Sequence, residues 1–282
     1  MGLKNHISEI NPNLVHSENR RGFPKELKIK KKKNKETKKG CNHPLFLKIM
    51  EDFLLGKKIY PSITTTFNSD WREQIKEVKK LSLKEVCLFL TCSKLKERKE
   101  IYGLLKKTKI KKIPLVHLRT DMELWELDYL IKNYHTEAFN IHSKTDYPLN
   151  YDYSKYKDII YIENVYNCFD KKELKNFGGI CLDLSHLEND RILNKKRFDC
   201  NKKIIKKYRI GCNHISTIKK NIHIDRSGEK RFSSHNLGNL SEFDYLKQYP
   251  SDYFSPIIAL ELENSIKEQL LAKDYIINLF KK

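Results

Sequence analysis

Residues 257–276, IIALELENSIKEQLLAKDYI, contain the structural unit from which most of the chain is built. The segment Ile257–Leu262 is a short, β-rich run that carries Glu261 near its end, and Glu263 follows it directly. Asn264 or Ser265 then marks the start of a helix, where Glu268 can complete a cap, and apolar residues follow at helical spacing. A strand that leads directly into a helix is typical of α/β proteins.

The same alternation of strand and helix runs back along the chain to about Tyr60. Eight β-rich runs are present, at Ile59–Phe67, Glu85–Thr91, Ile113–Leu118, Glu137–His142, Ile159–Asn164, Gly179–Leu184, Ile210–Ile215 and Ile257–Leu262. Eight strands that alternate with helices over about 220 residues predict an α/β fold of the (β/α)8 TIM-barrel type. A doubly wound open sheet is the alternative, but no Gly-rich nucleotide-binding motif follows any of the runs.

Two connections between the predicted strands differ from the rest. Ser143–Asp158, the fourth, contains Pro and Tyr residues and is predicted to lack a full helix. Ser216–Leu240, the seventh, is long and polar and contains Gly, and a helix is predicted after it at Ser241–Tyr249.

The net charge of +20 is divided unevenly along the 282 residues. Residues 1–43 carry 12 Lys and Arg against 4 Glu and are predicted to form a basic, flexible N-terminal tail, solvated or bound to a polyanion such as nucleic acid. Residues 44–282 are predicted to form a single barrel domain, which opens with an amphipathic helix at 44–58.

The seven cysteines show no C-x-x-C spacing, which argues against a disulfide framework and against a zinc site of the Cys type. Reduced and mostly buried thiols are therefore expected. The sequence has no apolar run long enough for a membrane helix and no secretory signal, so a soluble, cytoplasmic protein without a membrane partner is predicted.

Polar, titratable residues stand at the ends of consecutive predicted strands. The third run gives His117 and Arg119, the fourth His142, the fifth Glu163, the sixth Asp183 with His186, the seventh His214, and the eighth Glu261 with Glu263. In a TIM barrel these ends form one ring, where active-site residues lie. Carboxylates that converge there repel one another unless a positive charge lies between them, so a bound cation is expected.

Glu163, Asp183, His214 and Glu261 are the predicted metal ligands. Three carboxylates and one imidazole suit Mn²⁺, Mg²⁺, Co²⁺ or Zn²⁺, with water or substrate oxygens in the open positions. Glu263 lies on the same strand face as Glu261 and competes with it for the ligand role, and Glu261 is preferred.

Four segments resemble one known family. They are IENV at 162–165, GGICLDLSHL at 178–187, GCNHIS at 211–216 and the opening stretch at 257–276. Together they are similar to the xylose isomerase-like TIM-barrel superfamily, which contains sugar isomerases and epimerases together with endonuclease IV-type apurinic endonucleases. The resemblance runs from about Tyr60 to Phe280. It implies a divalent metal on the four ligands named above and, in the isomerases, proton transfer by the two Glu residues.

The resemblance to endonuclease IV is mixed. Those enzymes hold three zinc ions with additional His ligands, for which His117, His142 and His186 are the counterparts here. Their seventh loop also carries an Asp-Arg-His-His-like motif, and the similar stretch is residues 232–238. In that register Phe232 and Ser234 replace ligands and only His235 remains, while Asp225 would need a shifted loop to substitute. A site for one or two metals is therefore expected.

The sequence favours a metal-dependent isomerase or epimerase of a sugar, sugar phosphate or related polyol. Glu163 and Glu261 are the predicted catalytic residues, one removing the proton alpha to a carbonyl and the other returning it. Candidate substrate-binding residues are His117, Arg119, His142, His186, Arg226 and His235. The alternative is an endonuclease IV-like hydrolase of DNA phosphodiesters at abasic sites, with the basic surface holding DNA.

Overall fold

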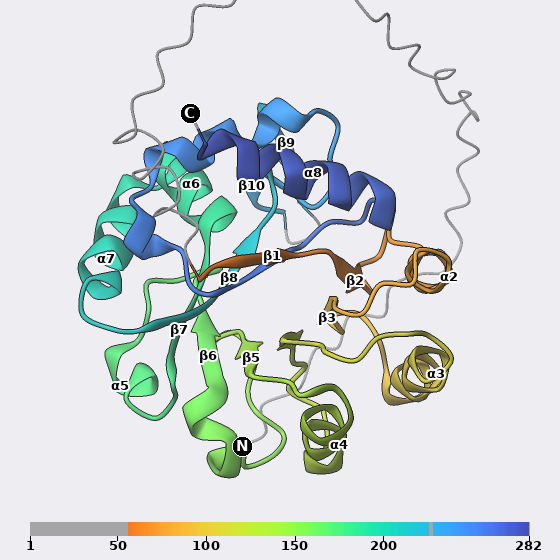
Figure 1. Ribbon diagram of the computed structural model, residues 1–282. Coiled ribbons are helices and arrows are strands. Elements are labelled where there is room, and N and C mark those ends of the chain that lie inside the picture. The colour runs from red at the N-terminus through yellow and green to blue at the C-terminus, as the bar shows by residue number, and fades with distance from the viewer. Residues whose placement is uncertain (1–55, 226–227, 282) are drawn as a thin grey trace, which may run out of the picture. The chain divides into compact units, whose positions relative to one another are not determined.

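The computed structural model describes residues 56–225 and 228–281, which form a parallel β-barrel with helices around it (Figure 1). Its sheet has nine strands in the order β1-β11-β8-β7-β6-β5-β4-β3-β2. They are β1 (Lys58–Tyr60), β2 (Ser62–Thr64), β3 (Cys87–Phe89), β4 (Leu115–His117), β5 (Ala138–Ile141), β6 (Ile160–Glu163), β7 (Gly179–Asp183), β8 (Ile210–Ile215) and β11 (Ile257–Leu260). The two ends of this order, β1 and β2, are consecutive in the chain, which gives the predicted (β/α)8 TIM barrel.

The predicted first strand, Ile59–Phe67, is divided in the structure. Pro61 separates β1, which pairs with β11, from β2, which pairs with β3. Proline has no backbone N–H to donate to a ladder, so the strand is interrupted there, although the Pro61 carbonyl accepts from the Cys87 amide at 2.9 Å. One interrupted strand thus contacts both of its neighbours and joins the two ends of the sheet.

Helices follow most strands and cover the outside of the barrel (Figure 1). They are α2 (Trp71–Lys80), α3 (Leu95–Leu105), α4 (Leu124–Tyr134), α5 (Lys171–Leu174), α6 (Leu184–Leu193), α7 (Lys195–Ile205) and α8 (Ile266–Leu279), with 3₁₀ helices η1 (Ser154–Ile159), η2 (Leu240–Gln248) and η3 (Ser251–Tyr253). Ser265 caps α8 and Glu268 completes the capping box. The fourth connection contains only η1, as predicted.

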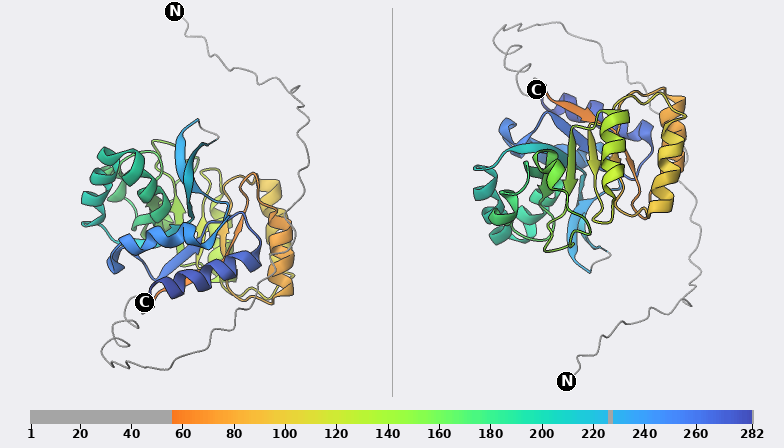
Figure 2. Two further views of the ribbon diagram at one scale, coloured as in Figure 1. Left: turned by 90° about the horizontal axis from the view of Figure 1, so that it is seen from above. Right: turned by 90° about the horizontal axis from the view of Figure 1, so that it is seen from below.

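The seventh connection differs from its prediction. Instead of a polar loop it forms an antiparallel hairpin of β9 (Thr217–Ile224) and β10 (Lys230–Ser234), which projects from the barrel (Figure 2). The β-branched residues along β9 favour an extended chain, and Gly228 adopts a positive φ of 82° before β10. The helix predicted at Ser241–Tyr249 is the 3₁₀ helix η2.

The expectation of reduced cysteines is wrong for one pair. Cys168, after β6, and Cys200, on α7, form a disulfide with a Cα–Cα distance of 6.0 Å. The two residues are 32 positions apart, so only the packing of α7 beside the β6 loop brings them together. Cys87, Cys181 and Cys212 are buried thiols, as expected.

Several predictions fall outside the described residues. These are the basic tail at 1–43, its boundary with the barrel domain, most of the amphipathic helix at 44–58, and Arg226. Within the described ranges, none of the helices has the length and apolar character needed to cross a membrane.

The barrel interior is packed by side chains of alternating strand positions, including Phe89, Leu115 and Tyr161. Gly211 on β8 lies directly against the Tyr161 ring, and a Cβ at this position would overlap the ring. A glycine is therefore required here for the interior to close.

We expect Gly211→Ala to lower the free energy of unfolding by about 1–3 kcal/mol, because the added methyl group forces the buried Tyr161 ring to shift. Gly103→Ala is the matched control. It lies in α3 with no atom within 4 Å of the added Cβ, and should stabilise by roughly 0.5–1 kcal/mol. Urea denaturation of both variants measures the difference, and equal effects would contradict the packing described here.

Candidate metal centre

The polar residues predicted at strand ends lie at one edge of the barrel, because parallel strands all end on the same side. Glu163 and Asp183 are the last residues of β6 and β7, and His214 is next to last in β8. Glu261 directly follows β11. The register between strands sets the level of these residues along the barrel axis; Asp183, for example, pairs with His214 across β7 and β8. All four side chains are buried, with Glu163 the most exposed at 5%.

These four residues form the first group of metal-binding atoms. One donor atom from each of Glu163, Asp183, His214 and Glu261 lies within 4.8 Å of the others. His214 Nδ1 is 3.4 Å from Glu163 Oε2, 3.5 Å from Glu261 Oε2 and 4.0 Å from Asp183 Oδ2. We call this set the carboxylate group.

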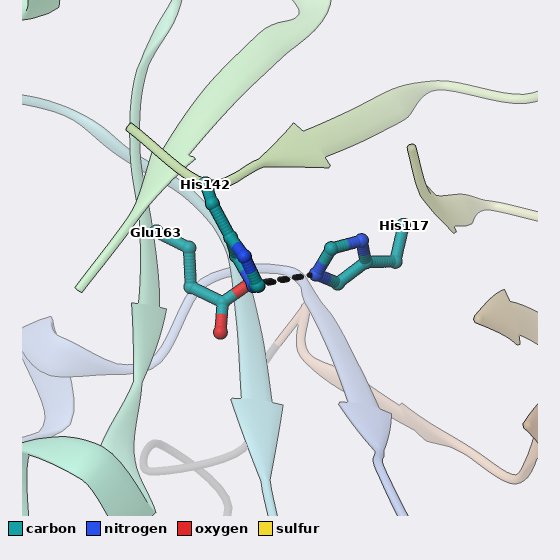
Figure 3. Close-up of side chains that lie close together, drawn as sticks. All are labelled: His117, His142 and Glu163. Carbon is teal, nitrogen blue, oxygen red and sulfur yellow. Dashed lines mark hydrogen bonds and ion pairs between the residues drawn. The ribbon is translucent and has the colours of Figure 1, made fainter. Parts of the chain in front are cut away.

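A second group shares Glu163 with the first. His117, the last residue of β4, and His142, which follows β5, point toward the Glu163 carboxylate (Figure 3). His117 Nε2 is 3.1 Å from Glu163 Oε2 and 3.2 Å from His142 Nε2, and His142 Nε2 is 3.7 Å from Glu163 Oε2. We call this set the histidine group.

Unsatisfied polar atoms in the carboxylate group fit a cation. Asp183 Oδ2 and both ring nitrogens of His214 are buried without a hydrogen-bond partner, although such atoms normally have one. A single imidazole cannot balance three buried carboxylates. A divalent cation bound here would satisfy both the orphaned atoms and the excess negative charge, and oxygen with imidazole donors suits Mn²⁺, Zn²⁺, Co²⁺ or Mg²⁺.

The histidine group has the tautomer that a metal ligand needs. His117 Nδ1 lies 2.9 Å from the Leu118 carbonyl, which can only accept, so this nitrogen carries the proton. His117 Nε2 is then an unprotonated acceptor that faces the Glu163 carboxylate, another acceptor. Two acceptors 3.1 Å apart call for a cation or a proton between them.

Burial and mutual repulsion shift the pKa values of the carboxylate group. Burial, with the negative charge of Glu163, raises the pKa of Glu261 to about 8 and that of Asp183 above its ordinary value. Burial opposes protonation of His214, but the surrounding carboxylates outweigh it and raise its pKa to about 10. Burial also lowers the pKa of His142 to about 3, which keeps that imidazole neutral.

The remaining predicted site residues differ in their distance from the carboxylate group. His186 Nε2 is 3.7 Å from Asp183 Oδ2, and His235 Nε2 is 3.7 Å from Glu261 Oε2, so both border the carboxylate group. Arg119 is held by hydrogen bonds to the Asp121 carboxylate and the Thr91 carbonyl. Glu263 is outside both groups and lies within 3.4 Å of Asn68, which favours Glu261 as the ligand.

Three residues at the site were not predicted from the sequence. Asn140 donates to Glu163 Oε2 at 2.7 Å, and Asn164 bonds to both the backbone N–H and C=O of Asp183. Asn140 shares a strand face with His142, a period-2 signal that could have identified it. Arg231 contacts His186 from the unpredicted hairpin, and no strand-end pattern points to it.

No family model and no curated protein matches the sequence. A xylose isomerase-like TIM-barrel protein from Mycobacterium smegmatis, solved in complex with magnesium, matches 79% of this chain and 96% of its own, at 10% identity and a TM-score of 0.40. A xylose isomerase domain-containing protein from Salmonella typhimurium matches 79% and 98%, at 12% identity and a TM-score of 0.43. An AP endonuclease of family 2 from Brucella melitensis matches 76% and 96%, at 10% identity and a TM-score of 0.38.

The chain resembles the xylose isomerase-like TIM barrels. The similarity concerns the fold, and the chemistry of the site rests on its own residues.

We expect Asp183→Asn to reduce cation affinity by roughly tenfold or more, because it removes one anionic ligand. The amide oxygen can still accept from the His186 amide at the start of α6, so the helix cap is retained. Asp128→Asn, at an exposed ion pair with Lys155, is the control. Metal atoms per chain after dialysis against Mn²⁺ or Zn²⁺ measure the effect. An unchanged metal content would contradict the ligand assignment.

Cation binding should strengthen as the pH rises from 6 to 9. In the folded protein the pKa values of Glu261 and His214 are about 8 and about 10, and both lie above the values in the unfolded chain. The folded state therefore binds these protons more tightly, and the free energy of unfolding falls as the pH rises and the protons are released. A cation displaces the same protons and gains affinity. The increase in Tm that Mn²⁺ causes should therefore be larger at pH 9 than at pH 6. In Glu261→Gln this increase should depend less on pH. A pH-independent increase would contradict this account.

Proposed function

We propose that the protein is a divalent-metal-dependent enzyme that holds two neighbouring cations and hydrolyses a phosphoester. The observation that carries this proposal is the position of Glu163, whose carboxylate belongs to both the carboxylate group and the histidine group. Paired cations bridged by one carboxylate are a recurring arrangement in phosphoester hydrolases, where they polarise the phosphoryl oxygens and activate water when bound.

The surroundings of Glu163 favour a ligand role over a proton-transfer role. Its Oε2 accepts a 2.7 Å hydrogen bond from Asn140 and lies within 3.1–3.7 Å of His117, His142 and His214. A carboxylate oxygen that accepts a short hydrogen bond from Asn140 and lies beside His214, whose raised pKa keeps it protonated, is a weak base. A mechanism with two catalytic Glu residues, which the sequence favoured, needs Glu163 to accept a proton from substrate.

An isomerase or epimerase is the second candidate, and Glu261 is the observation that favours it. Its pKa of about 8 makes this carboxyl able to give and take a proton near neutral pH. Glu261 belongs to the carboxylate group but not to the histidine group, and its Oε2 is 3.5 Å from His214 Nδ1. The substrate of such an enzyme would be a sugar, sugar phosphate or related polyol.

One variant separates the two candidates. His117→Gln removes a ligand from the histidine group but none from the carboxylate group. For the hydrolase, Mn²⁺-loaded wild type should cleave bis(4-nitrophenyl) phosphate or an abasic-site duplex, and His117→Gln should lose roughly 10- to 100-fold of that rate and one metal per chain.

If the protein is an isomerase or epimerase, the same protein preparations should give a different result. Wild type would exchange a proton alpha to the carbonyl in a panel of ketoses, aldoses and sugar phosphates in deuterated water, as followed by NMR. Glu261→Gln would abolish that exchange, whereas His117→Gln would retain it. Exchange without phosphoester cleavage would overturn the hydrolase proposal.

A further inference from the structure

Arg231 is a buried cation beside the carboxylate group. It lies on β10 and is 5% exposed. Its Nε donates to Asp225 Oδ2 at 2.6 Å, a terminal nitrogen lies 3.4 Å from Glu229 Oε2, and its guanidinium sits 5.3 Å above the Tyr166 ring. These contacts hold the planar group in one orientation.

The other end of the guanidinium reaches His186. Arg231 Nη1 is 3.3 Å from His186 Nδ1. An arginine N–H can only donate, so His186 Nδ1 must accept and the proton of the neutral imidazole resides on Nε2. His186 Nε2 is 3.7 Å from Asp183 Oδ2 and 3.9 Å from Glu163 Oε1. Arg231 thus makes His186 present an N–H donor, and not a lone pair, toward the carboxylate group.

Arg231 also retains donor capacity. A guanidinium has five N–H groups, and three have partners among the described residues. Asp225 compensates part of its charge, and Glu229 is farther away, with 43% of its side chain exposed. Arg119, the described arginine predicted to hold an anionic substrate end, is instead paired with both oxygens of Asp121.

We propose that Arg231 and His186 form the recognition site for a phosphoryl group, with Arg231 supplying positive charge and N–H donors and His186 supplying its Nε2–H. This inference rests on the proposed function, since it places an anionic substrate beside the two metal-binding groups. A tetrahedral phosphoryl group presents several oxygens and matches donors on two side chains at once. His186 is then a substrate-binding donor and does not ligate a cation through Nε2.

Binding of inorganic phosphate to the full chain tests the site. The titration is done by calorimetry with and without Mn²⁺, and the metal content of each sample is measured first. Arg231→Met should weaken phosphate binding at least tenfold in either condition, and Arg231→Lys, which keeps the charge and a donor, should recover part of it. Arg72→Met, which removes an exposed ion pair with Glu100, should bind phosphate as wild type does.

A second readout follows the tautomer of His186. In the Zn²⁺-loaded protein, side-chain ¹⁵N NMR should show His186 protonated on Nε2 in wild type and in Arg231→Lys, and a changed pattern in Arg231→Met. In a steady-state assay of phosphoester hydrolysis, Arg231→Lys should raise KM and leave kcat nearly unchanged.

The outcomes distinguish this inference from the proposed function. If Arg231→Met and Arg231→Gln keep their metal and their fold but bind phosphate like wild type, the recognition site is wrong and the metal-dependent hydrolase stands. Failure of wild type to bind phosphate at all overturns the recognition site too. If wild type binds no cation, the hydrolase fails, and the cation-free titration still decides the role of Arg231.

Discussion

Three carboxylates buried together at one edge of the barrel are the constraint on which the site depends. Glu163, Asp183 and Glu261 are each at most 5% exposed, and moving an ionised carboxylate out of water costs several kcal/mol even after the protein relaxes. Burial, together with their mutual repulsion, raises the pKa values of Glu261 and Asp183. The sheet keeps them together, so their repulsion is relieved by a proton on Glu261 or by a positive charge among them, and a divalent cation would relieve it more fully than one imidazolium.

The closed parallel sheet makes this convergence possible. Each strand contributes one ligand at the same edge, and the ladder between β7 and β8 fixes Asp183 opposite His214. Closure in turn depends on two local features, the break at Pro61 that lets one strand serve both neighbours, and Gly211 under the Tyr161 ring. A change in the barrel interior therefore alters the distances between ligands that are far apart in the sequence.

The barrel and the positions of most candidate ligands could be predicted from the sequence, because a strand and its polar last residue are local patterns. Glu163 and Asp183 required only strand boundaries and the rule that parallel strands end on one side. The sharing of Glu163 by two groups could not be predicted, since it depends on side-chain directions across β4, β5 and β6. The Cys168–Cys200 disulfide and the contact of Arg231 with His186 are tertiary pairings over 32 and 45 residues, which leave no periodic signal.

Among the described residues, no group of candidate metal ligands includes His186, and the seventh connection explains why. A third cation would need donors near His186, but Phe232 offers none from its side chain and its backbone N–H donates to Asn189. Asp225, which a shifted loop would have brought to this place, is paired with Arg231. The guanidinium then fixes the His186 proton on the nitrogen that a cation would use. The β9–β10 hairpin therefore places a fixed monovalent cation, Arg231, beside His186, and under the proposal above its charge would act on an anionic substrate.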